Sequence, residues 1–155
     1  MTGTIDARVA ALGVTLPEAP APRANYRPWV ITGDLLYISG NVPLGSDGLE
    51  YQGKVGADFG LKKAQAAAWL CAINILAQIR AALDGDLDRV RQIVKLGGFV
   101  NCTPDFADHP AVINAASDLM VEVFGEAGRH ARFAVGAASL PFNVAVEIDA
   151  VVEFS

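Results

Sequence analysis

The stretch from Gly128 to Phe154 constrains the fold most, because it contains two runs typical of β-strands. Residues 128–136 and 144–154 are rich in β-branched and aromatic side chains. In the second run the side chains alternate, and one face would carry Val144, Val146, Ile148, Ala150, Val152 and Phe154. Residues 137–143 between them have the length of a hairpin loop. The pattern therefore predicts an antiparallel strand pair.

Arg132 and Glu147 are the charged residues that this hairpin would bring together. Directly opposed residues share a face of a sheet, so the two side chains would lie next to each other on an otherwise largely apolar strand pair. Such a pair can clamp a substrate carboxylate beside an acid or base. It can also be a plain cross-strand ion pair. The pattern alone favours the plain pair, because perturbed charge pairs are structural as well as functional.

The composition indicates one domain whose surface is partly covered. A chain of 155 residues suits a single domain, here residues 1–155 with an N-terminal extension over residues 1–25. Hydrophobic residues make up 52% and charged residues only 19%. This is apolar for a soluble domain of this size, and it suggests that another subunit covers some of the surface.

Several classes of function are disfavoured by the same composition. The net charge is −5 and no basic cluster occurs, so nucleic-acid binding is not indicated. The apolar stretch 64–76 is interrupted by Gln65 and Asn74 and is too short to span a bilayer. With no visible signal peptide, the expected compartment is the cytoplasm. Two cysteines and two histidines predict neither a disulfide framework nor a metal site.

The first part of the chain reads as a short helix, an extended linker and a hairpin. Residues 4–13 have one apolar stripe, with Thr4 as a possible cap. Prolines forbid helix over residues 16–22. Residues 26–32 and 35–40 then read as two strands around a Gly-Asp turn. The glycine at position 40 allows a close backbone approach by a ligand or another chain, or forms a simple bulge.

Two helices and a strand follow. Residues 58–83 form a long helix with a predicted core face of Trp69, Ala72, Ile73, Leu76, Ile79 and Leu83. Cys71 is interpreted as a small core residue, since no basic residue flanks it. Residues 90–101 read as a strand with a kink at Gly97-Gly98, and a second helix runs from about 111 to 124. His109, just before this helix, is interpreted as a surface or capping residue.

This order of elements predicts an α+β fold with two helices against one face of a sheet. Two helices cannot cover both faces. Because the uncovered face carries Val, Phe and Ile, we expect copies of the same chain to bury it.

Three segments resemble the Rid family, also called YjgF-like and formerly L-PSP endoribonucleases. Tyr37-Ile38-Ser39-Gly40-Asn41-Val42-Pro43 is similar to its strand ending in Ser-Gly-Gln-x-Pro. Phe99-Val100, Asp105-Phe106 and Val112-Ile113-Asn114 are similar to its strand, Asp-Phe turn and Val-Asn helix entry. Ala131-Arg132, Leu140-Pro141 and Val146–Ala150 are similar to its Ala-Arg, Leu-Pro and Val-Glu-Ile-Glu-Ala signature. The linker and the region around residues 125–130 resemble a longer branch of the family.

The resemblance implies a fold, an assembly and an activity. The fold is chorismate-mutase-like, with a mixed sheet, two long helices on one face and a barrel-like homotrimer. The implied activity is cofactor-free, metal-free hydrolysis of reactive enamine or imine intermediates, such as 2-aminoacrylate, to a 2-keto acid and ammonia at clefts between subunits. The expected ligand is therefore a small carboxylate-bearing imine or enamine, and the protein is expected to be a hydrolase of the deaminase type.

The resemblance also assigns roles to particular residues. Arg132 matches the arginine that binds the substrate carboxylate, and Glu147 matches the glutamate thought to position or activate water. Positions that line or shape the cleft are matched by Tyr26, Ser39, Gly40 and Asn114. Two positions after the arginine depart from the family pattern. Phe133 replaces a residue that is often small and polar, and Ala134 replaces a cysteine that many members carry. Phe133 should point away from Arg132 along the strand.

Two other functions remain open. One is a non-catalytic trimer that binds a small carboxylate metabolite, because similar folds and sites do not establish activity. The other is the ribonuclease of the older family label, which is weak here because affinity for phosphates comes mainly from clustered Lys and Arg.

Overall fold

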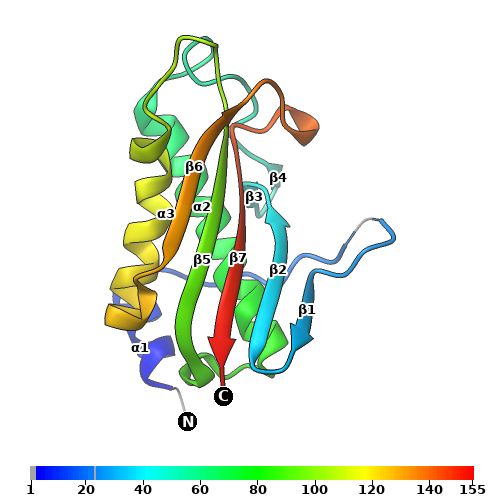
Figure 1. Cartoon of the computed structure of the whole chain (residues 1–155), viewed down its shortest axis with the longest axis vertical. Helices are drawn as coiled ribbons and strands as arrows, with labels where there is room; N and C mark the ends of the chain where they lie inside the picture. The colour runs from blue at the N-terminus through cyan, green and yellow to red at the C-terminus, as the bar shows by residue number, and fades with distance from the viewer. Residues whose placement is uncertain (1–2, 23) are drawn as a thin grey trace.

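A five-stranded mixed sheet forms the middle of the protein, with two long helices packed on one of its faces (Figure 1). The structure is a computed structural model that describes residues 3–22 and 24–155. The sheet has the order β1-β2-β7-β5-β6. Its strands are β1 (Trp29–Thr32), β2 (Leu35–Asn41), β5 (Val90–Asn101), β6 (Ala131–Ala137) and β7 (Val146–Phe154). This architecture confirms the predicted α+β fold.

The two C-terminal strands do not form the predicted hairpin. β5 lies between them, parallel to β6 and antiparallel to β7. β7 pairs with β2 on its other side. The segment after β6, which contains a 3-10 turn over Pro141–Asn143, therefore crosses from one edge of the sheet to its middle. The prediction was wrong because strand patterning identifies the buried face of a strand and not its neighbour.

Helices α2 (Leu61–Ala82) and α3 (His109–Phe124) cover the sheet with small and branched side chains. Along α2 the buried positions include Ala64, Ala67, Ala68, Cys71, Ala72, Ile75, Leu76 and Ile79. Trp69 is 40% exposed, so its predicted place in the core was wrong. The alanine-rich stripe of α2 lets the helix approach the sheet closely and leaves the large indole outside. In α3 the apolar stripe of Val112, Ala116, Leu119 and Val123 is buried.

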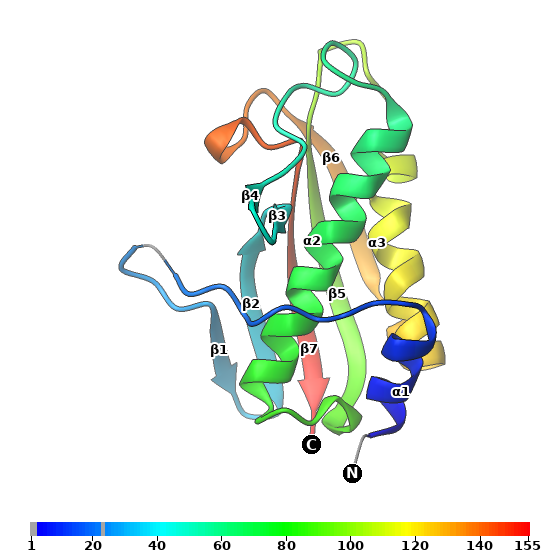
Figure 2. The ribbon, with the colours of Figure 1, turned by 180° about the vertical axis from the view of Figure 1, so that it is seen from behind.

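The N-terminal segment runs across the outer side of the helices. α1 (Thr4–Ala11) begins after Gly3, and the Asp88 carboxylate accepts hydrogen bonds from the backbone N–H groups of Thr4 and Ile5. The proline-rich linker then crosses α2, as Figure 2 shows. Gln78 donates a hydrogen bond of 2.9 Å to the carbonyl of Pro20. The linker is thus attached to the body of the fold.

Short elements complete the chain. β3 (Leu44–Gly45) and β4 (Gly48–Leu49) form a two-stranded ribbon, and 3-10 turns lie at Leu87–Arg89 and Gly125–Gly128. The sheet face away from the helices carries exposed Tyr37, Phe99 and Val135. None of the helices in the described ranges has the length and apolar character that crossing a membrane would require.

Candidate functional site

The six candidate site residues fall into two groups in the protein. Tyr26, Ser39, Gly40 and Glu147 line one cavity of about 330 Å³, next to β2 and the start of β7. The other two, Asn114 and Arg132, meet where α3 packs on β6 at the sheet edge. The structure therefore gathers four of the six candidates at one place and two at another.

Arg132 and Glu147 do not lie side by side within one chain. Arg132 is in register with Leu96 of β5, whose side chain is fully buried beneath the helices. Glu147 is in register with Phe99, which lies on the uncovered face. The two charged groups are thus on opposite faces of the sheet with β5 between them. The predicted cross-strand pair, whether a clamp or a plain ion pair, was wrong for a single protomer.

Neutral side chains hold the Arg132 guanidinium on the helix face. Its Nη1 donates to Oδ1 of Asn114 at 2.8 Å and to Oγ of Ser117 at 3.1 Å. These two acceptors account for both hydrogens of Nη1. Within residues 3–22 and 24–155 no carboxylate forms an ion pair with Arg132. The N–H groups of Nε and Nη2 form the other edge of the guanidinium. Such an edge can bind a carboxylate through two parallel hydrogen bonds, and here it is available to a ligand.

Phe133, the first departure after the arginine, lies on the other side of the strand. Its ring packs edge-on against Phe99 with 5.2 Å between centroids. The ammonium of Lys95 lies 5.3 Å from the centre of the same ring. Phe133 thus contributes to the uncovered face and does not touch the guanidinium on the helix face.

The cavity places a half-buried carboxyl group against a glycine. Gly40 lies so close to Glu147 that a Cβ there would collide with Oε1 of the carboxyl group. The Ser39 hydroxyl donates a hydrogen bond of 2.7 Å to the carbonyl of Arg27. This contact connects β2 to the segment before β1, next to Tyr26. Burial raises the pKa of the Glu147 carboxyl, and the nearby Asp149 carboxylate raises the pKa further. A carboxyl group with a raised pKa is suited to both accepting and returning a proton.

The raised pKa of Glu147 has a consequence for stability. Because the ionised form is less favourable in the folded state, the free energy of unfolding falls as the pH rises from the ordinary glutamate range through the raised pKa. Glu147→Gln removes this loss. We expect the variant to have a higher Tm than the wild type near pH 7 and nearly the same Tm near pH 3, where the wild-type carboxyl is also neutral. Calorimetric scans at the two pH values test this, and a variant destabilised at pH 7 would contradict it.

The inner wall of the cavity contains two carboxamides from α2 that the sequence analysis did not assign to the site. Asn74 donates to the carbonyls of Val42 and Leu44, each at 3.0 Å, and Gln78 donates to Pro20. Their oxygens are buried and have no donor among the described residues. The sequence signal was their four-residue spacing between apolar neighbours in the helix. Two acceptors without donors suit a bound water or a hydrogen-bond donor of a ligand.

Cys102 and His109 form a pair outside this cavity. Sγ of Cys102 lies 3.3 Å from Nε2 of His109, at the end of β5 and the start of α3. Burial raises the pKa of the Cys102 thiol, which disfavours the thiolate needed for nucleophilic attack. Cys71 is fully buried and its pKa is raised for the same reason, as its core position predicts. In the described part of the chain, no three His, Cys, Asp or Glu side chains are grouped as metal ligands would be.

Comparisons with known proteins identify the family. The sequence profile described as "YjgF/chorismate_mutase-like, putative endoribonuclease" matches residues 6–154. Protein TCP17 of Trypanosoma cruzi is 48% identical over 155 residues, which is 99% of this chain and 96% of that protein. The chain belongs to the YjgF/chorismate-mutase-like family, as the three sequence segments indicated.

Two crystal structures show the same fold. The protein Atu1372 of Agrobacterium tumefaciens, described as having unknown function, is 53% identical with a TM-score of 0.91, over 97% of this chain and 94% of that one. A protein from Shewanella oneidensis described as a putative endoribonuclease is 38% identical with a TM-score of 0.94, over 98% and 100% of the two chains. The similarity therefore extends over nearly the whole chain, including the N-terminal extension.

Proposed function

We propose that the protein hydrolyses small imines or enamines that carry a carboxylate, such as 2-aminoacrylate, to 2-keto acids and ammonia. The site lies in a cleft between neighbouring protomers of a homotrimer. One protomer contributes Arg132 and Asn114 from the edge of its sheet, and the next contributes Tyr26, Ser39, Gly40 and Glu147 from its cavity. The resemblance to the Rid family motivates this proposal, and the arrangement of the two groups of residues supports it.

The observation that carries the proposal is how Arg132 is held. The two acceptors of Nη1, Asn114 and Ser117, are neutral. They therefore leave the positive charge of the guanidinium uncompensated and its Nε–Nη2 edge available to a ligand. This arrangement suits a small anion that arrives from solvent and binds through two parallel hydrogen bonds.

A second protomer is needed because Glu147 cannot reach Arg132 in its own chain. β5 separates the two side chains, and they face opposite sides of the sheet. The apolar side chains on the uncovered face, including Tyr37, Phe99 and Val135, provide a surface for self-association. A closed ring of three copies would repeat one heterologous contact three times and create three equivalent clefts.

The chemistry requires only binding, orientation and one group that moves protons. An enamine first takes a proton from solvent on carbon and loses one from nitrogen to solvent, which converts it to an imine with an electrophilic carbon. With the carboxylate bound by Arg132, Glu147 removes a proton from water as the water oxygen bonds to that carbon. The carboxyl then returns the proton to the nitrogen of the tetrahedral adduct. The hydroxyl proton of this adduct then passes through the Glu147 carboxyl to the nitrogen as the carbon–nitrogen bond breaks, which releases ammonia and the 2-keto acid.

A coupled assay tests the proposed reaction. A serine dehydratase generates 2-aminoacrylate, and the formation of pyruvate is followed with and without this protein. We expect the rate of pyruvate formation to rise in proportion to the protein added. An unchanged rate across a broad range of protein concentrations would rule out this substrate class.

A carboxylate-binding trimer without catalysis is the second candidate. Glu147 is the one carboxyl group among the cavity's described lining residues, so loss of its proton transfer would leave a site that only binds. The endoribonuclease description of the family supports a third candidate. The net charge of −5 counts against the third, since binding of a phosphate backbone relies on clustered Lys and Arg.

A further inference from the structure

We propose that Ser117 and His130 are positioning residues, which hold the Arg132 guanidinium in the orientation that binds a carboxylate. This inference rests on the proposed role of Arg132. Neither residue was a candidate in the sequence analysis, and neither lines the cavity that contains Glu147. They act on Arg132 through a chain of hydrogen bonds whose donor and acceptor roles can be deduced atom by atom.

The chain begins at the backbone carbonyl of Gly128. Nδ1 of His130 lies 2.6 Å from this oxygen, and a carbonyl oxygen can only accept, so Nδ1 carries the hydrogen. In the neutral ring Nε2 is then an acceptor. Nε2 lies 2.9 Å from Oγ of Ser117, so the Ser117 hydroxyl donates its single hydrogen to His130. This fixes the rotation of the hydroxyl group.

With its hydrogen committed to His130, Oγ of Ser117 directs its lone pairs toward Arg132. Nη1 of Arg132 donates to this oxygen at 3.1 Å, and its second hydrogen is bound by Asn114. Two acceptors on one nitrogen define the plane of the guanidinium, because the group is rigid and planar. The Nε–Nη2 edge therefore keeps one orientation, and no carboxylate in the described part of the chain pairs with it.

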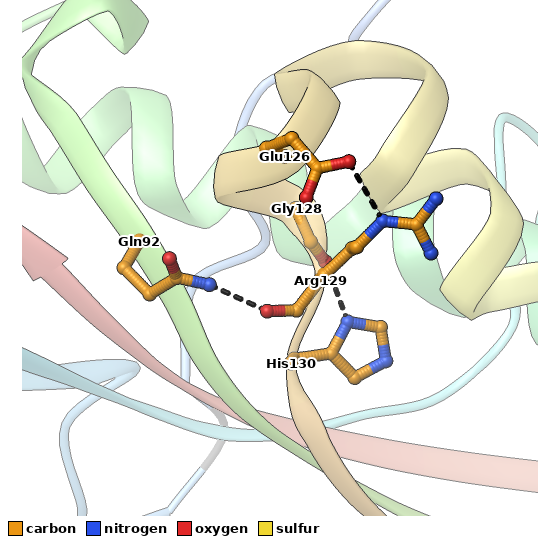
Figure 3. Close-up of polar contacts among 5 residues, drawn as sticks. All are labelled: Gln92, Glu126, Gly128, Arg129 and His130. Atoms are coloured by element: carbon orange, nitrogen blue, oxygen red, sulfur yellow. Dashed lines mark hydrogen bonds and ion pairs between the residues drawn. The ribbon is translucent and has the colours of Figure 1, made fainter.

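The segment that carries His130 is itself anchored, as Figure 3 shows. The Gln92 side chain donates to the backbone carbonyl of Arg129 at 2.5 Å, a contact that does not use the Arg129 side chain. That side chain instead forms an exposed pair with the Glu126 carboxylate at 3.0 Å. Gly128 is buried so tightly that a Cβ there would collide with the backbone of Met120 in α3. The carbonyl that orients the imidazole is thus held from both β5 and α3.

Paired substitutions separate this role from ordinary packing. Ser117→Ala removes the hydroxyl, whereas Ser117→Thr retains it. His130→Asn keeps a donor near the position of Nδ1, whereas His130→Gln places an acceptor near the position of Nε2 and can still receive the Ser117 hydrogen. We expect Ser117→Ala to raise KM about 5- to 50-fold with little change in kcat, and His130→Asn to raise KM about 3- to 10-fold. The Thr and Gln variants should stay within about twofold of the wild type.

A spectroscopic measurement tests the proposal without relying on turnover. Nitrogen-15 NMR of the wild type at low temperature should show distinct, slowly exchanging Nη signals for Arg132, assigned by their loss in Arg132→Ala. Ser117→Ala should average these signals, and Ser117→Thr should restore them. Averaged signals in the wild type, or distinct signals that persist in Ser117→Ala, would overturn the positioning role. If the NMR result holds but no imine or carboxylate is bound or hydrolysed, the proposed function fails and the positioning of Arg132 stands.

Discussion

Arg132→Ala is expected to lower kcat/KM for 2-aminoacrylate hydrolysis by about 100- to 1,000-fold. The substitution removes the guanidinium proposed to bind the substrate carboxylate through two parallel hydrogen bonds. The loss should appear mainly in KM, with a smaller loss in kcat because the reacting carbon is no longer oriented toward water. Steady-state kinetics in the coupled assay, with the dehydratase in varied excess, measures both constants.

Arg129→Ala is the matched control for this prediction. Arg129 is three residues away, is exposed and pairs with Glu126 on the surface. Its removal changes the net charge by the same amount, so a general electrostatic effect on an anionic substrate would affect both variants alike. We expect the control to retain wild-type kinetics within about twofold. Equal losses in the two variants would show that Arg132 has no specific role.

Glu147→Gln is expected to lower kcat by about 100- to 10,000-fold with little change in KM. Glutamine keeps the shape of the side chain next to Gly40 but cannot accept a proton from water. The same variant is expected to be more stable than the wild type near neutral pH, because it lacks the cost of ionising a half-buried carboxyl group. A Glu147→Gln variant with a lower kcat and a higher stability would show that Glu147 serves catalysis at a cost to the stability of the fold.

Asp149→Asn provides the comparison for Glu147. Asp149 lies on the same uncovered face, two residues along β7, and its charge contributes to the raised pKa of Glu147. Removing that charge should lower the pKa of Glu147 and shift the acidic limb of the kcat profile to lower pH. The maximum rate should stay within about tenfold of the wild type. A wild-type kcat in Glu147→Gln would eliminate the proton-transfer role.

Much of the fold was predictable because local patterns determine it. The Gly33-Asp34 turn, the linker prolines and the apolar stripe of α3 each specify an element regardless of the rest of the chain. The neighbours of the strands were not predictable in the same way. The loop after β6 is short enough for a hairpin, yet β5 pairs with both β6 and β7. Strand partners depend on packing of the whole sheet, which periodicity does not encode.

The candidate site was also predictable only in part: its residues could be identified from the sequence, but their arrangement in space could not. The segment resemblance identified Arg132, Glu147 and the four other candidates by position. It did not indicate that β5 separates Arg132 from Glu147, since that follows from strand order. It also missed Ser117 and His130, whose contact with Arg132 depends on how α3 packs on β6. A serine on a helix and a histidine before a strand carry no sequence signal for such a contact.

Subunit complementation is the most direct test of a cleft shared between protomers. Arg132→Ala and Glu147→Gln chains are produced together with different tags, and doubly tagged assemblies are purified. In a cyclic trimer that contains both kinds of chain, one of the three clefts has both residues intact, so activity should recover to about a third of the wild type. If the site were confined to one chain, every site in the mixture would lack one residue. Activity no higher than that of the separate variants would therefore contradict the account.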